Sequence, residues 1–120
     1  NTLLEVDVTT MESTKSVIGV INRLSEYENY LDFDMKTWYN YQEQFIGINV
    51  NSVGEGCINV CGLNGNIEAG DLITSSALRG KGMKQADDIV RNYTVAKSTE
   101  DVIFDFPEQV KTIACTYMCG

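Results

Sequence analysis

The stretch from Gly54 to Gln85, GEGCINVCGLNGNIEAGDLITSSALRGKGMKQ, constrains the fold of this chain more than any other. It holds seven of the ten glycines, so its backbone can adopt conformations that other residues avoid. Within it, Asn64-Gly65 lies between two apolar runs, which is a strong signal for a hairpin turn. The stretch therefore predicts a strand, a tight turn, a second strand and a glycine-hinged loop.

The rest of the chain carries the same β pattern. Apolar and polar residues alternate in runs about ten residues apart, and proline occurs once, at Pro107. We expect one all-β domain over residues 1–120, a small sandwich or barrel or a β-prism-like repeat of hairpins, with room for one short helical turn at 86–88. Gly54-Glu55-Gly56 is expected to interrupt a strand. The expected strands cover residues 3–10, 16–24, 44–53, 57–61, 72–76, 89–97, 102–106 and 110–117.

Charge and composition exclude several functions. The net charge of −8 disfavours nucleic acid and anionic membranes as partners, and no apolar run is long enough to cross a bilayer. Histidine is absent, which removes Ser-His-Asp and Cys-His catalytic sites. Gly80-Lys81-Gly82 lacks the motif of a phosphate-binding loop, so we expect no nucleotide and no other cofactor. Because the chain starts at Asn1, we expect it to be part of a longer protein.

The four cysteines form two pairs with the same spacing, Cys57/Cys61 and Cys115/Cys119. Residues four apart on a strand lie about 13 Å from each other, too far to share one metal ion. The same spacing places both on one face of the strand, which suits small buried thiols. Buried free thiols are favoured over disulfides, and a metal site is the least favoured of the three interpretations.

Residues 25–41, SEYENYLDFDMKTWYNY, form a long excursion rich in rings and carboxylates. Aromatic rings stack on sugar faces and carboxylates hold sugar hydroxyls, so this composition is typical of a carbohydrate-binding surface. The candidate binding residues are Trp38, Tyr39, Tyr41, Asp32 and Asp34. The alternative is a long surface loop whose rings pack against the sheet or a neighbouring subunit.

With histidine absent, carboxylates are the remaining candidates for acid–base chemistry. Glu55 lies between two glycines and Asp71 follows Gly70 at a turn, and these two are the candidate catalytic residues. A structural role is the competing interpretation, because an aspartate in this position commonly bonds to nearby backbone N–H groups.

A resemblance sharpens the hypothesis. The strings NSVGEGCINVCGLNGNIEAGDLITSS, GKGMKQADD, NYTVAK and IACTYMCG resemble the C-terminal domain of bacteriophage tail appendages and related large-virus fibre proteins. That group resembles the self-cleaving intramolecular-chaperone domain classed among glutamic peptidases. The match covers the second two-thirds of the chain, with some support from residues 13–20.

The resemblance implies a structural and assembly domain at the end of a viral fibre or tail appendage. It implies a homotrimer located in the virion, with other fibre subunits as partners. One alternative is a self-cleaving chaperone that uses carboxylates. Another is a tip that binds surface glycans or a receptor. No enzyme activity other than self-cleavage is expected.

Overall fold

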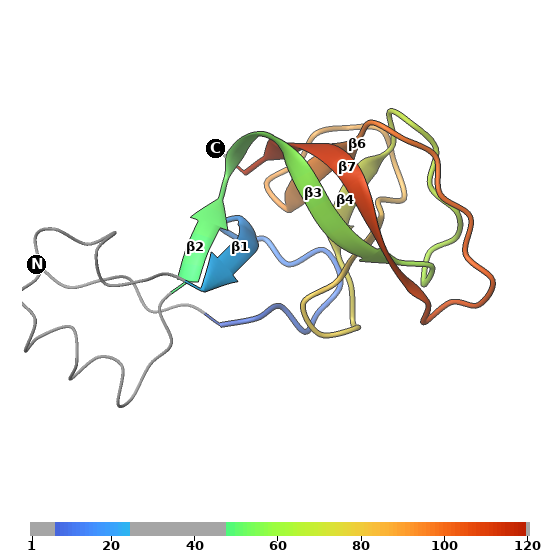
Figure 1. The fold of residues 1–120 in the computed structure, drawn as a ribbon, viewed down its shortest axis with the longest axis horizontal. Helices are drawn as coiled ribbons and strands as arrows, with labels where there is room; N and C mark the ends of the chain where they lie inside the picture. Colours follow the sequence, from blue (N-terminus) through green and yellow to red (C-terminus); the bar gives the residue numbers. More distant parts are fainter. Residues whose placement is uncertain (1–6, 25–47, 120) are drawn as a thin grey trace, which may run out of the picture.

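The computed structural model describes residues 7–24 and 48–119 (Figure 1). These ranges contain seven strands and no helix, which confirms the all-β prediction. The helical turn predicted at 86–88 does not form. Residues 86–89 instead bend around the buried Gln85 side chain, whose Nε2 donates to the Asp87 carboxylate at 2.9 Å and to the Ile89 carbonyl at 2.8 Å.

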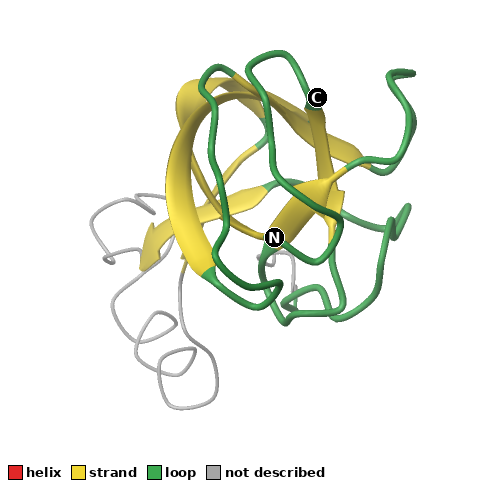
Figure 2. Ribbon diagram, turned by 90° about the vertical axis from the view of Figure 1, so that its right-hand side faces the viewer, coloured by secondary structure: helices red, strands yellow, loops and turns green. Residues whose placement is uncertain are grey.

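Five strands close into a barrel in the order β3-β5-β4-β6-β7 (Figure 2). Their bounds are β3 Val53–Cys61, β4 Leu72–Ser75, β5 Gly82–Lys84, β6 Thr94–Ser98 and β7 Val110–Met118. All neighbours are antiparallel except β3 and β5, which are parallel. The strands β1 (Val20–Leu24) and β2 (Ile48–Asn51) form a separate antiparallel pair beside the barrel.

The longest ladder joins β3 to β7 through nine residue pairs, from Val53–Met118 to Cys61–Val110. The predicted interruption at 54–56 is wrong, because β3 runs through both glycines. Gly54 has a φ of +95° and Gly56 makes room for a tyrosine ring described below, so each glycine serves the strand without ending it.

Several predicted strand bounds need correction. The turn at 64–65 forms, with Gly65 at a φ of +95° and its N–H bonded to the Gly62 carbonyl, but the return consists of one bridge between Ile67 and Val102. Residues 7–10 are not in a strand, β1 begins only at Val20, β6 begins only at Thr94, and 103–106 form no strand. The hydrogen bonds that each β-prone run makes with other strands decide which of its residues form a strand.

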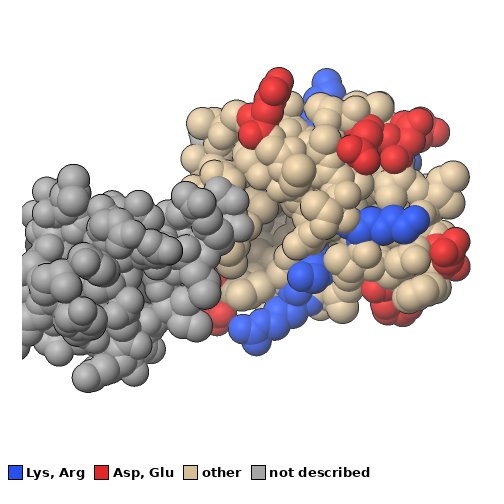
Figure 3. All heavy atoms as spheres, viewed as in Figure 1, with Lys and Arg blue, Asp and Glu red and all other residues tan. Residues whose placement is uncertain are grey.

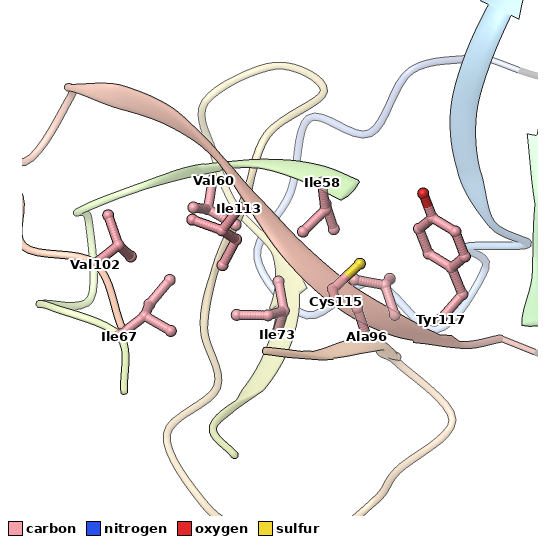
Figure 4. Close-up of a cluster of buried hydrophobic side chains, with 10 residues drawn as sticks. Ile58, Val60, Ile67, Ile73, Ala96, Val102, Ile113, Cys115 and Tyr117 are labelled. Atoms are coloured by element: carbon pink, nitrogen blue, oxygen red, sulfur yellow. The ribbon is translucent and has the colours of Figure 1, made fainter. Parts of the chain in front are cut away.

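Apolar side chains from every barrel strand except β5 fill the interior (Figure 4). Ile58 and Val60 from β3, Ile73 from β4, and Ile113 and Cys115 from β7 meet there. Val17 and Val20, which precede or begin β1, are partly buried against this cluster. The N-terminal segment therefore packs onto the barrel.

Candidate functional site

The barrel is weakly closed at one seam. The strands β3 and β5 share one residue pair, Val60 with Gly82, whereas β3 and β7 share nine. Residues 7–19, here called the strap, lie beside this seam. The strap is fixed by bonds from Ser13 N to the Ser75 carbonyl (3.1 Å), from Ser75 Oγ to the Met11 carbonyl (2.7 Å) and from Gly80 N to the Thr9 carbonyl (2.8 Å).

A cleft of about 1270 Å³ lies between the strap and β3. One wall comes from the strap and the β1–β2 pair, and another from residues 55–59 of β3. Residues 79–82 line it as well, and Val95 and Tyr117 reach it from the barrel interior. The described surface on the face in Figure 3 is largely uncharged, and its Lys, Arg, Asp and Glu side chains form small groups, some with both signs next to each other.

The side chain of Tyr117, on β7, extends across one face of β3 to the cleft edge of that strand. Its hydroxyl accepts a hydrogen bond from Cys57 N at 3.0 Å and donates one to the Cys57 carbonyl at 2.6 Å. The ring passes over Gly56, where an added Cβ would collide with the ring and the hydroxyl. The position of the Tyr117 side chain, which is 7% exposed, therefore requires a glycine at position 56.

The backbone of β3 presents a regular set of polar groups to the cleft. Ala114, which is opposite Cys57, directs its N–H to the Glu100 carboxylate and its carbonyl to Thr99 N, away from β3. Cys57 and Ala114 thus form a non-hydrogen-bonded pair, and the N–H and carbonyl of Cys57 point away from β7. By alternation, those of Glu55 and Asn59 point the same way.

Charged groups lie on both sides of this cleft. Glu55 and Asp7 are among its lining residues, as are Arg79 and Lys81. Arg79 and Asp7 form an exposed ion pair at 3.7 Å, whereas Lys81 and Glu55 form none with the residues that the structure describes. The cleft therefore combines apolar walls with two cations and two carboxylates.

The two candidate catalytic carboxylates have different surroundings. Glu55 is exposed at the cleft. Asp71 accepts a hydrogen bond from Glu68 N at 2.8 Å and an ion pair from Lys84 Nζ at 3.6 Å, so it fixes the 68–71 turn. The strand β5 lies between β3 and β4, and no hydrogen bond in the described ranges joins the two carboxylates.

The candidate glycan-binding residues Trp38, Tyr39, Tyr41, Asp32 and Asp34 lie outside the described residues. The glycan hypothesis stays a prediction.

The cysteines are all free thiols, and the disulfide interpretation is not realised. Cys61 and Cys115 are buried as predicted and Cys119 is half-buried, but the prediction is wrong for Cys57, which is exposed. Burial raises the pKa of the Cys115 thiol to about 11. Residues 7–24 and 48–119 contain no group of three or more Cys, Asp or Glu that could hold a metal ion.

Sequence reasoning missed the pairing of Gly56 with Tyr117. The two are 61 positions apart, and the only local signal was a glycine inside an otherwise regular β run. Sequence reasoning also missed Gln85, which is 4% exposed. Its Oε1 accepts a 2.6 Å hydrogen bond from Thr94 Oγ1, so this polar residue links β5 to β6.

Fold and site together define an all-β barrel domain with an open seam and an adjoining cleft. No family model, curated protein or solved structure matches the chain. Among the described residues, no helix is long and apolar enough to span a membrane.

Proposed function

We propose that this domain is a structural and assembly module of a viral fibre or tail appendage that associates with copies of itself as a homotrimer. The supporting observation is a set of exposed large apolar side chains near the seam, here called the apolar strip. Their exposed fractions run from 36% to 66%. The strip consists of Met11, Ile18, Ile21, Val50 and Val53.

The strip is suited to contact between acidic chains. Ile21 and Val50 are cross-strand partners on the β1–β2 pair, and Val53 begins β3 immediately afterwards. Residues 16–21, SVIGVI, and 50–54, VNSVG, contain no charged residue. A second copy can therefore bury the apolar surface of these two segments without burying a charge that they carry, although Glu12 follows Met11 and Glu55 lies two residues after Val53 on the same face of β3. The number of copies, three, comes from the resemblance.

The test is the mass of the domain in solution, measured by native mass spectrometry and by sedimentation across a range of concentrations. The wild-type chain is expected to be a trimer. Val53→Asp should shift it toward monomer, because a carboxylate would be buried in the interface. Ile103→Asp is the matched control, since Ile103 is equally exposed but lies outside the strip. A wild-type monomer at every concentration would remove the proposal.

Self-cleavage is the second candidate function, and the exposed position of Glu55 in the cleft favours it. Asp71 already has a structural role in its turn, so Glu55 is the better of the two candidates. A longer chain that includes this domain should then be cut, and Glu55→Gln should stop the cut. Asp71→Asn should reduce cutting only as far as it reduces stability. A longer chain that stays whole during assembly would rule this function out.

A further inference from the structure

We infer that the domain binds a basic, apolar segment of a partner protein at the end of the barrel away from the β1–β2 pair. This site goes beyond self-association and uses none of the residues of the apolar strip. It consists of four exposed apolar side chains, here called the distal patch. Their exposed fractions run from 36% to 68%, and they belong to Leu63, Ile103, Phe106 and Val110.

The distal patch lies far from the apolar strip. Val53 of the strip begins β3, whereas Cys61, the last residue of β3, is opposite Val110. Eight steps along a strand span about 26 Å, so the two surfaces lie at opposite ends of the β3–β7 ladder. Figure 1 shows the same separation, with the β1–β2 pair at one side of the barrel and the loop between β6 and β7 at the other.

The patch is assembled from two segments. Val110 is opposite Cys61 in the ladder, and Leu63 follows two residues after Cys61. Gly62, between them, packs so closely on Phe104 that an added Cβ would lie 2.8 Å from Phe104 Cγ. The turn that follows β3 and the loop that precedes β7 therefore form one continuous surface.

Hydrogen bonds fix the loop that carries the patch. Ile67 and Val102 exchange two backbone hydrogen bonds, at 3.0 and 2.8 Å. Gln109 N donates to the Phe106 carbonyl at 3.1 Å, and Gln109 Oε1 accepts from Asp105 N at 2.8 Å. A loop that is already ordered loses little conformational entropy when a partner binds to it.

The core of the barrel does not account for all the apolar residues of this loop. In the run 102–106, VIFDF, Val102 is buried and Phe104 is partly buried against the core. Ile103 and Phe106 are exposed instead. Exposed apolar side chains that gather in one place are typical of a surface that binds a partner.

Carboxylates surround the distal patch. The two segments that carry it, 61–71 and 99–111, contain six acidic residues and one lysine. Glu100 and Asp101 accept hydrogen bonds from Ala114 N and Ala69 N, whereas Glu108 forms no hydrogen bond or ion pair with the described residues. The six acidic residues are Glu68, Asp71, Glu100, Asp101, Asp105 and Glu108.

Three lysines lie within or beside these segments. Lys111 donates from Nζ to the Ile103 carbonyl at 2.8 Å, and Lys84 forms an ion pair with Asp71 at 3.6 Å. Lys97 is on β6, opposite the first residue of β4. Six carboxylates and three lysines leave an excess of negative charge, so a complementary partner segment is basic.

A second copy of the chain fits the patch poorly. Two distal patches in contact would bring their carboxylates together, and juxtaposed like charges disfavour such a contact. The uncharged segments of the apolar strip, 16–21 and 50–54, offer the patch no cation. A basic segment of another protein is therefore the better occupant.

The probe is a nine-residue peptide of leucine, lysine and threonine. It is added up to about 1 mM to the ¹⁵N-labelled 120-residue chain, and the amide chemical shifts are followed by nuclear magnetic resonance. The expected result is saturable shift changes at Leu63 and at residues 103–110. Affinity should fall as the ionic strength rises from about 0.05 M to about 0.5 M, because salt screens exposed charges.

Matched variants separate the apolar contribution from the electrostatic one. Ile103→Ser should weaken peptide binding at least about fivefold, because it removes the most exposed apolar side chain of the patch. Glu108→Lys should weaken it at least about threefold, whereas Glu12→Lys makes the same change of charge on the strap and should not. Val53→Asp should change the mass of the assembly and leave peptide binding unchanged.

Three results would overturn the inference. The first is that no shift changes appear at residues 103–110. The second is that a peptide with glutamate in place of lysine binds equally well, which would refute the basic partner. The third is shift changes at the same residues that grow with protein concentration in the absence of peptide, which would make a second copy the occupant. Native mass spectrometry of the same samples reports self-association separately, so either proposal can fail alone.

Discussion

Tyr117→Phe gives the most direct test of how the seam is built. The substitution leaves the buried ring over Gly56 and removes only the hydroxyl. Two hydrogen bonds are lost, at 3.0 Å from Cys57 N and at 2.6 Å to the Cys57 carbonyl. The stability of the barrel should fall, because nothing else in the described ranges bonds to these two groups.

The magnitude follows from the surroundings. A hydrogen bond contributes about 0.5–1.5 kcal/mol net, so two contribute about 1–3 kcal/mol. Cys57 is exposed, and water in the cleft can replace part of the loss, so the lower part of that range applies. We expect a loss of about 1–2 kcal/mol.

The assay is urea unfolding with amide exchange measured in parallel. With a urea slope of about 2 kcal/mol/M, the midpoint should fall by roughly 0.5–1 M. The Cys57 amide should lose its protection, while those of Gly56 and Ile58, which face β7, should keep theirs. Tyr93→Phe is the control, because the Tyr93 hydroxyl forms no hydrogen bond with any described residue. An unchanged midpoint together with an unchanged Cys57 amide would refute the capping role of Tyr117.

Four further predictions concern the barrel and its thiols. Gly56→Ala should cost about 1–3 kcal/mol in urea unfolding, because the new methyl group collides with the Tyr117 ring; additive costs of Gly56→Ala and Tyr117→Ala in the double variant would contradict this. Gln85→Leu should cost about 2–4 kcal/mol in thermal unfolding, since it removes a buried hydrogen bond with Thr94 and part-buried ones to Asp87 and Ile89; a loss below about 1 kcal/mol would refute the role of this network. Hydrogen bonds from Arg91 and then Gln85 lower the pKa of Asp87, so its contribution is present above the unfolded value of about 4 and is lost as pH falls through the lower folded value. Acid unfolding of Asp87→Asn should show less pH dependence there than that of Asp88→Asn, and equal profiles would contradict it. Iodoacetamide should modify exposed Cys57 before buried Cys115, and mass spectrometry that finds Cys115 modified first would contradict the burial of this thiol. Because the pKa of Cys115 is raised to about 11, the contribution of this thiol to stability should fall as pH rises from about 9 to about 11.

The sequence allowed prediction of the fold class because its signals are local. Residues 110–117 alternate along one strand, and β7 is found at Val110–Met118. The 68–71 turn follows from Gly70, which has a φ of +96°, and from Asp71, whose side chain bonds to Glu68 N. Each of these features depends on residues a few positions apart, so the sequence contains what is needed to infer them.

The candidate site depends on contacts between residues far apart in the sequence, and no local sequence pattern indicates these contacts. The carboxylates Glu55 and Asp71 matched a local motif, but β5 lies between their strands. The cleft arises because the strap reaches Ser75 and Gly80, more than 60 positions away, while β3 meets β5 at one residue pair. Loop closure over such distances is decided by the packing of the whole barrel.

The stretch from Gly54 to Gln85 contains both kinds of feature, those that the sequence predicts and those that only the tertiary structure decides. Its glycines and alternating residues by themselves determined short strands and tight turns, because conformational freedom and side-chain period are properties of each residue and its nearest neighbours. Only the tertiary structure decided that Gly56 lies under a tyrosine 61 positions away and that β3 meets β5 at one residue pair. Both follow from strand register, which is set when the core residues of β3 and β7 are buried together.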